Sequence, residues 1–202
     1  MSGKIITIAR QYGSGGREIG KLLAEKCGLE FYDNNLITMS ANKIGMDAER
    51  LTEADEKVPN SILYTLAAGS SMYGSVYNTN FQPINDKLFL AQSEIIEEIA
   101  KKGSAVIVGR CADYVLEGRD NVTRVFLYAG FDRRVAEISR RHGLPAAESK
   151  SLVLKTDKRR ANYYNYYTGK KWGRLENYDM ALSTDKLSSE EACDIIRHLA
   201  GL

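Results

Sequence analysis

The chain has 202 residues, of which 44% are hydrophobic and 27% are charged, and its formal net charge is +2. This composition is ordinary for a folded protein, and the length is enough for one sizeable hydrophobic core but too short for two large domains. The near balance of 28 basic and 26 acidic residues gives no case for a nucleic-acid or membrane partner.

Cysteine and histidine usage narrows the class of protein further. The three cysteines lie far apart and show no zinc-like spacing, which favours a reduced, cytoplasmic setting. The two histidines fall in helix-like segments and disfavour a histidine triad or a histidine metal site. No apolar run approaches the length of a membrane span, and residues 4–9 predict a short strand instead of a signal peptide.

The stretch IITIARQYGSGGREIG joins a β-branched run to a cluster of glycines. Residues 4–9 predict a strand, residues 13–16 a glycine turn, and residues 16–27 an amphipathic helix that Gly28 closes. This layout is typical of a phosphate-binding loop, because glycines let the backbone approach a phosphate and the helix start presents free N–H groups. The alternative is a glycine-rich turn without a ligand.

The side chains of this loop depart from the phosphate-loop motif G-x-x-x-x-G-K-[ST]. With Gly15 on the second motif glycine, Arg10 falls on the first, Gly16 on the lysine and Arg17 on the Ser/Thr. The lysine that reaches the outer phosphates and the hydroxyl that holds magnesium are therefore both absent. The position of the loop after a strand favours phosphate binding, whereas its amino-acid sequence lacks the two most diagnostic side chains of the motif.

The rest of the chain alternates between strand and helix patterns. After the loop we expect a strand at 30–32, a helix that Asp33 or Asn34 caps, and a short helix near 47–51. Residues 61–81, rich in small polar residues and tyrosines, predict either a loop that closes over a ligand or a plain surface loop. The later elements are a helix from about 85 to 102, a strand at 105–108, a short helix over 114–116, a strand at 122–128, helices at 131–142 and from 146 to about 164, a strand at 180–183 and a final helix capped by Ser188.

Strands that alternate with helices predict a parallel sheet with helices on both faces. In such sheets ligands bind outside the carboxyl ends of the strands. The polar residues that follow the strands are Arg10, Asp33, Arg110 and Asp113, so we expect them to converge on one rim. Taken singly, each has a simpler explanation, because an exposed arginine is usually solvated and an aspartate after a strand usually caps a helix.

A second cluster, KTDKRRANYYNYYTGKKW, spans residues 155–172. Asp157 and Arg160 are three residues apart and share one helix face. Basic residues beside tyrosines are also found in nucleic-acid sites, but the net charge and the single short cluster argue against that partner. A lid that brings arginines onto phosphates fits better, and a solvated basic helix with packed tyrosines is the alternative.

Five segments together resemble the cytidylate kinase-like family, relatives of bacterial cytidylate kinase: ITIARQYGSGGREIGKLLAEKCG, FYDNNLI, VIVGRCADYVL, DKRRANYYNYYTGKKWG and YDMALSTDKLSSEEACDII. The resemblance runs nearly end to end and is weakest between about 57 and 83. It implies a single domain over 1–202 with a three-layer α/β P-loop kinase-like fold, in which a parallel sheet of about five strands has helices on both faces. It also implies an acceptor-binding insertion at about 34–84 and a helical lid region at about 146–175.

The resemblance implies a nucleoside monophosphate kinase that transfers the γ-phosphoryl group of ATP, with Mg²⁺, to CMP or dCMP. The expected ATP and phosphate site consists of Arg10, Gly13, Ser14, Gly15, Gly16 and Arg17. The expected acceptor site consists of Asp33, Arg110, Asp157 and Arg160, where Arg110 matches the arginine of the family's G-R-D motif. The expected catalytic residues are Arg17, Lys158 and Arg160, and Lys158 matches a lid position that is often arginine.

Two departures from the wider kinase pattern shape the hypothesis. Members of the like-family share the GSGGRE spelling, and the aspartate of G-R-D is Cys111 here, with Asp113 two residues on. We therefore expect Arg17 or Arg10 to supply the missing positive charge, and Asp113 or Asp33 to help place Mg²⁺. The alternatives are a non-catalytic nucleotide- or phosphate-binding protein on the same fold, and a kinase for another small acceptor.

Overall fold

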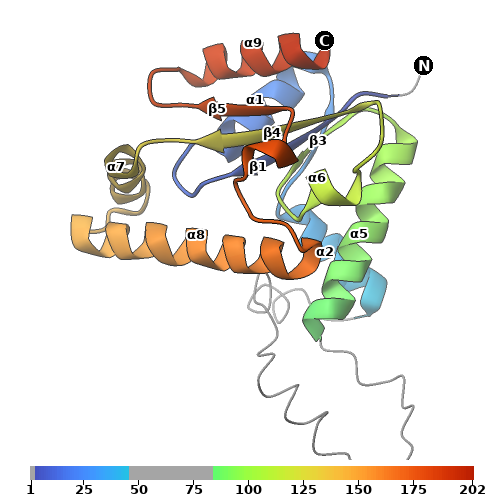
Figure 1. Ribbon diagram of the computed structural model, residues 1–202, viewed down its shortest axis with the longest axis horizontal. Helices are drawn as coiled ribbons and strands as arrows, with labels where there is room; N and C mark the ends of the chain where they lie inside the picture. The colour runs from blue at the N-terminus through green and yellow to red at the C-terminus, as the bar shows by residue number, and fades with distance from the viewer. Residues whose placement is uncertain (1–2, 46–83) are drawn as a thin grey trace, which may run out of the picture.

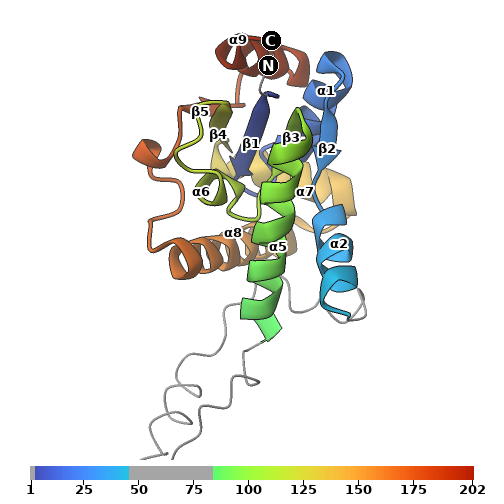
Figure 2. The ribbon, with the colours of Figure 1, turned by 90° about the vertical axis from the view of Figure 1, so that its right-hand side faces the viewer.

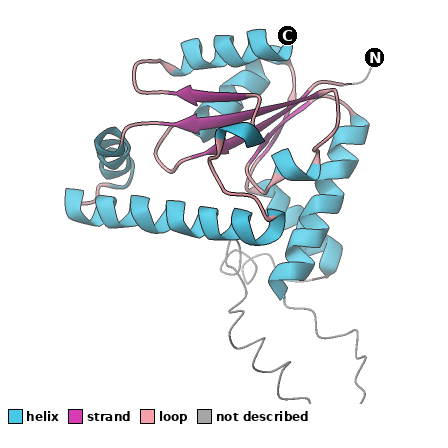
Figure 3. Cartoon of the chain, viewed as in Figure 1, coloured by secondary structure: helices cyan, strands magenta, loops and turns pink. Residues whose placement is uncertain are grey.

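The computed structural model describes residues 3–45 and 84–202. Within them a five-stranded parallel sheet has the order β2-β3-β1-β4-β5. The strands are β1 (Ile5–Arg10), β2 (Glu30–Tyr32), β3 (Ala105–Val108), β4 (Val122–Tyr128) and β5 (Met180–Ser183). Because all strands are parallel, their carboxyl ends lie at one edge, which is on the left of the sheet in Figures 1 and 3.

The central strand β1 explains why this sheet has helices on both faces. Its residue Ile8 pairs with Val108 of β3 on one side and with Val125 of β4 on the other. All three are fully buried, as expected for a β-branched strand with no solvent-facing side. The apolar runs of the sequence therefore lie in the middle of the sheet and hold the loop that follows β1 at its centre.

Helices cover the two faces of the sheet and its carboxyl edge (Figures 1 and 2). One face packs against α1 (Gly16–Cys27) and α9 (Ser189–Ala200), through a core that includes Leu23 and Ile196. The other face packs against α2 (Asn35–Ile44), α5 (Ile84–Lys102) and α6 (Ala112–Val115), through a core that includes Leu36 and Ile96. The remaining helices are α7 (Phe131–His142), α8 (Ala146–Thr168) and the 3₁₀ turn η1 (Leu175–Asn177).

Most of the predicted elements in the described residues are confirmed, several of them to the residue. The first strand lies one residue later than predicted, at Ile5–Arg10, and the predicted capping box at Ser188 is present. Neither Asp33 nor Asn34 caps α2 through its side chain: Asn34 is the N-cap without such a bond, and Asp33 binds arginines instead. The predicted helix at 47–51 and the loop at 61–81 lie outside the described residues.

The end of α8 was predicted wrongly. The helix continues past Tyr164 to Thr168 and ends at Gly169, which adopts a left-handed conformation. Its last turn is held by tertiary contacts, since Tyr167 stacks on Phe89 at 4.2 Å and donates a hydrogen bond to Asp86. Across the described ranges, no helix has both the length and the apolar character that crossing a membrane requires.

Candidate functional site

The loop between β1 and α1 has the backbone shape of a phosphate loop. We call residues 11–17 the glycine loop. Gly13 and Gly15 have φ angles of 83° and 81°, which side chains rarely tolerate, and Gly15 is the N-cap of α1. A Cβ on Gly13 would lie 2.8 Å from the carbonyl oxygen of Arg134, so this glycine is also needed for close packing. The loop therefore delivers the N-terminus of α1, with its unpaired N–H groups, to the carboxyl edge of the sheet.

The glycine loop is held from behind by α7 and α8. The carboxylate of Asp157 accepts hydrogen bonds from the Tyr12 N–H at 2.7 Å and from Arg134 Nη1 at 2.5 Å. Arg134 is itself buried and donates to the carbonyl oxygens of Tyr12 and Ala129. Thr184, after β5, donates to the Ser14 carbonyl at 3.0 Å. These bonds fix the loop before any ligand arrives, which lowers the entropic cost of binding one.

Arg10 occupies the space that a lysine at position 16 would need. A Cβ on Gly16 would lie 2.7 Å from Arg10 Cβ and 2.9 Å from Arg10 Cγ. Further out, the Arg10 guanidinium lies against Gly109, where an added Cβ would meet Nη1, and its Nη2 is 3.7 Å from Asp33 Oδ1. The side chain therefore crosses the carboxyl ends of β1, β3 and β2 in front of the glycine loop.

Arg17 and Asp33 form the second charged contact at the loop. Arg17 Nε donates to Asp33 Oδ2 at 2.7 Å. The Asp33 side chain is 4% exposed, whereas that of Arg17 is 64% exposed. One buried carboxylate thus faces two guanidinium groups, those of Arg10 and Arg17, and the local charge in front of the loop is positive.

The segment after β3 is held in an unusual backbone conformation. Gly109, Arg110 and Cys111 have φ angles of 81°, 58° and 55°, so three successive residues are left-handed. For a residue with a side chain this costs on the order of 1–3 kcal/mol, and such strain is concentrated at functional sites. Both Arg110 and Cys111 are buried. The strained turn sets the direction of Arg110, which the sequence placed in the acceptor site.

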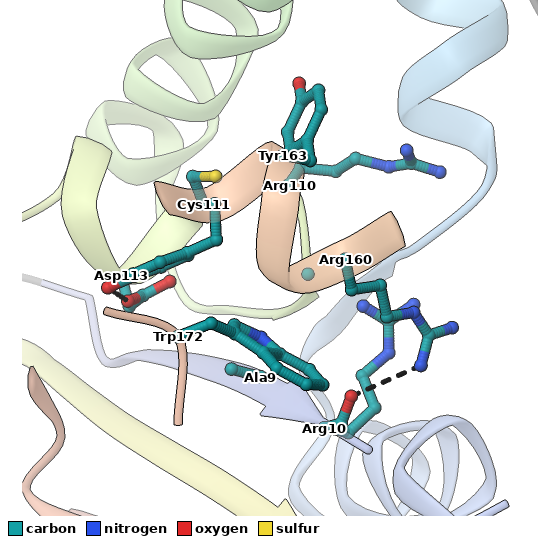
Figure 4. Close-up of a pocket in the computed structure, with 10 residues that line it drawn as sticks. Ala9, Arg10, Arg110, Cys111, Asp113, Arg160, Tyr163 and Trp172 are labelled. Atoms are coloured by element: carbon teal, nitrogen blue, oxygen red, sulfur yellow. Dashed lines mark hydrogen bonds between the residues drawn. The ribbon is translucent and has the colours of Figure 1, made fainter. Parts of the chain in front are cut away.

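A pocket lies between this turn and α8. We call it the arginine pocket; its lining residues are Ala9, Arg10, Gly109, Arg110, Cys111, Asp113, Arg160, Tyr163, Tyr164 and Trp172. Figure 4 shows the side chains of Arg10, Arg110 and Arg160 on one side of it and Asp113 on the opposite side. Arg160 Nη1 donates to the Arg10 carbonyl at 3.2 Å, and its guanidinium lies 5.4 Å from the centre of the Tyr12 ring. The pocket is therefore directly joined to the glycine loop.

Asp113 is tied to α8 at the far wall of this pocket. Its Oδ2 accepts a hydrogen bond of 2.7 Å from the Tyr164 hydroxyl. Burial raises the pKa of the Asp113 carboxyl, and burial with the neighbouring carboxylate raises the pKa of Tyr164. The structure thus places Asp113 away from the glycine loop, across the pocket from Arg10.

The residues at the site do not fit a protein-built Mg²⁺ site, which the fold family implies. Asp33 already faces two arginines, Asp113 already accepts from Tyr164, and position 17 has no hydroxyl. Within residues 3–45 and 84–202, no group of three or more His, Cys, Asp or Glu side chains could hold a metal ion. The expectation that Asp113 or Asp33 helps place Mg²⁺ therefore finds no support in this geometry.

A second, larger groove is lined in part by the glycine loop. We call it the outer groove; its lining residues are Gly13, Ser14, Gly15, Glu18, Ile19, Arg133, Ala136, Glu137, Arg140, Arg141, Thr184, Leu187 and Ser189. Arginines of α7 and apolar side chains thus border the same loop as the arginine pocket. The outer groove includes the glycine loop itself, and the arginine pocket adjoins the loop through Arg160, whose guanidinium lies over Tyr12.

The structure brings together most of the residues that the sequence selected. Arg10, Arg110, Arg160 and Asp113 line one pocket, and Asp33 contacts Arg10 and Arg17. Asp157 lies behind the glycine loop and is not among the pocket-lining residues, while Lys158 is exposed on α8.

Sequence reasoning missed two residues that support the loop, Arg134 and Thr184. No local signal links either residue to the glycine loop, because both reach it through contacts more than 100 residues away in the chain.

Comparison with known proteins agrees with this architecture. A cytidylate kinase from Methanopyrus kandleri is 24% identical over 96% of this chain and 91% of its own length. An uncharacterized protein from Eubacterium ventriosum superimposes with a TM-score of 0.71 at 24% identity, covering 98% of both chains. Shikimate kinase from Bacteroides thetaiotaomicron superimposes with a TM-score of 0.51 at 13% identity, over 98% of this chain and 99% of its own.

The last likeness shows the fold, which is the three-layer P-loop kinase fold that the resemblance implied. The family model described as "Cytidylate kinase-like family" matches residues 5–186, which include every described element except α9. The chain therefore belongs to the cytidylate kinase-like family.

Proposed function

We propose that the chain is a phosphotransferase that moves the γ-phosphoryl group of ATP to the phosphate of CMP or dCMP. One observation carries the proposal: Arg10, Arg110 and Arg160, from three different elements, line one pocket joined to a glycine loop. A nucleoside monophosphate brings a dianionic phosphate, and guanidinium groups bind such a phosphate with two parallel hydrogen bonds. The arginine pocket is the acceptor site in this proposal.

The donor site is the glycine loop together with the outer groove. The ATP phosphates bind the N–H groups at the start of α1, where the helix dipole favours negative charge. The nucleoside lies in the outer groove, which offers apolar Ile19 and Leu187 and the arginines of α7. The relative from Methanopyrus kandleri is a cytidylate kinase, and its name supports CMP as the acceptor.

Arg10 and Arg160 line the arginine pocket and also lie against the glycine loop, Arg10 beside Gly16 and Arg160 over Tyr12. During transfer, an oxygen of the acceptor phosphate bonds to the γ-phosphorus, and the bond from that phosphorus to ADP breaks. Positioning and neutralisation of charge provide most of the catalysis of such a step. We assign this neutralisation to Arg10, Arg17 and Arg160, with Lys158 approaching from α8 when the lid region closes. Asp33 and Asp157 complete the proposed acceptor side by orienting these arginines and the loop.

A non-catalytic nucleotide-binding protein is the second candidate. The observation that favours it is the absence of the motif lysine, since Gly16 has no room for a side chain beside Arg10. A kinase for another small acceptor is the third candidate, because a fold does not fix the acceptor and the resemblance is weakest between about 57 and 83, within the expected acceptor-binding insertion.

The test is a coupled assay of ADP release with ATP, against CMP, dCMP, UMP, AMP and GMP. We expect turnover to be highest with CMP or dCMP. Arg110→Ala and Arg160→Ala should each lower kcat/KM for the acceptor by roughly 100-fold, as loss of a charge-stabilising donor does. Lys155→Ala, an exposed change on α8, is the control and should keep wild-type kinetics. ATP binding without turnover on any acceptor would instead support the non-catalytic candidate.

A further inference from the structure

Position 17 has a cation where the phosphate-loop motif has a metal-binding hydroxyl. In the motif, the Ser/Thr at this position coordinates Mg²⁺, which in turn neutralises the phosphates. Here Arg17 stands at that position and donates to Asp33 at 2.7 Å. Its side chain is 64% exposed, so the outer part of the guanidinium can turn toward a ligand on the glycine loop.

The carboxylate that contacts Arg17 is already neutralised by protein cations. Asp33 is 4% exposed, with Arg17 at 2.7 Å and Arg10 at 3.7 Å. A divalent cation at Asp33 would have to displace Arg17 and would then lie beside a second guanidinium, where like charges repel. The two hydroxyls of the loop are engaged within the protein: that of Ser14 donates to the Gln11 carbonyl at 2.9 Å, and that of Tyr12 lies 3.0 Å from His142 Nε2.

The motif lysine is replaced in the same way. Arg10 fills the space beside Gly16, and its guanidinium lies at the carboxyl ends of the neighbouring strands. Arginine remains charged at every physiological pH and binds phosphate through two donors. The lysine and the metal ion of other loops are thus both replaced by arginine side chains of this chain.

We propose that the glycine loop binds the nucleotide phosphates through Arg10 and Arg17 without a divalent cation, so that nucleotide affinity is independent of Mg²⁺. This rests on the proposed donor site, and it concerns binding and not the later transfer step. The ligand class is a nucleoside triphosphate or diphosphate in its metal-free form.

The experiment measures the dissociation constant of ATP by calorimetry, once with excess MgCl₂ and once with EDTA. We expect the two constants of the wild-type protein to agree. Arg17→Ser should weaken binding in EDTA by about tenfold or more, and MgCl₂ should recover part of that loss, because the variant has a hydroxyl and an Asp33 freed from Arg17. Lys21→Ser, an exposed change one turn further along α1, is the matched control and should leave both constants unchanged.

Three results would overturn the inference: ATP binding by the wild type only with MgCl₂, equal binding of Arg17→Ser and wild type in EDTA, or no binding of ATP under either condition. The proposed function can fail separately. If ATP binds in EDTA but no acceptor is turned over, the transferase is contradicted while metal-free binding still stands. A thermal unfolding curve of each variant confirms that it is folded.

Discussion

A single methyl group on Gly16 tests whether Arg10 occupies the place of the motif lysine. Gly16 is the first residue of α1, and a Cβ built on it lies 2.7 Å from Arg10 Cβ and 2.9 Å from Arg10 Cγ. Contacts below 3.0 Å between such atoms are essentially never seen, and the position of Arg10 Cβ is fixed by the backbone, so rotation of the side chain cannot relieve the clash. Gly16→Ala must therefore move β1 against α1.

The magnitude follows from two opposing effects. Glycine to alanine in a helix normally raises the free energy of unfolding by about 0.5–1 kcal/mol. Overpacking of a close-packed contact lowers it by about 1–3 kcal/mol. We expect Gly16→Ala to lower the free energy of unfolding by about 1 kcal/mol. A double-mutant cycle of Gly16→Ala with Arg10→Gly should show a coupling energy of about 1–3 kcal/mol.

Urea denaturation of a short series of variants measures this coupling. Arg10→Ala keeps the clashing Cβ, so the pair Arg10→Ala with Gly16→Ala should stay destabilised. Arg10→Gly removes that Cβ, so in this background Gly16→Ala should become neutral or stabilising. Gly103→Ala, where an added Cβ meets nothing within 4 Å, is the control and should not destabilise. If Gly16→Ala stabilised the wild-type protein, or if its effect were the same in all three backgrounds, the assigned position of Arg10 would be wrong.

Two further changes test the surroundings of the site. Asp157→Asn keeps an acceptor for Tyr12 but removes the charge that faces buried Arg134, and it should lower the free energy of unfolding by about 3 kcal/mol. Asp194→Asn, which removes the exposed partner of Lys26, should change the free energy of unfolding by less than about 1 kcal/mol. Equal losses for Asp157→Asn and Asp194→Asn would contradict the importance of burial at Asp157. Burial raises the folded-state pKa of Asp113 above its ordinary value of 3.8, so this carboxylate destabilises the fold progressively as pH rises above that value. Asp113→Asn should therefore raise the melting temperature at pH 7 and lose this advantage toward pH 4, and a melting temperature difference that does not depend on pH would refute the cause.

The elements could be predicted from the sequence because their signals are local. Glycines end α1 and α7, a capping box begins α9, and unbroken apolar runs mark the buried strands. The end of α8 could not be predicted, because its last turn depends on Phe89, about 80 residues earlier in the chain. Local patterns hold no information about such contacts.

The candidate site was predictable to the level of which strand ends meet. The parallel order brings Arg10 and Asp33 within 3.7 Å, as the convergence of strand ends requires. The directions of the side chains were not predictable. Asp157 faces the back of the glycine loop because Arg134 and the Tyr12 N–H together satisfy it, and Asp113 faces Tyr164 for the same reason. A buried carboxylate points to its donors, and sequence spacing does not reveal where those lie.

The residues at positions 10, 16 and 17, which differ from the phosphate-loop motif, depend on one another structurally. Position 10 is glycine and position 16 lysine in the motif, whereas this chain has arginine and glycine. Because the two Cβ positions would be 2.7 Å apart, only one of them can carry a side chain in this backbone. A lysine at 16 would require the loss of Arg10, and the loss of Arg10 would leave Asp33 with Arg17 alone. The loop can therefore regain the motif lysine only after Arg10 is lost, so arginine at position 10 and glycine at position 16 depend on each other.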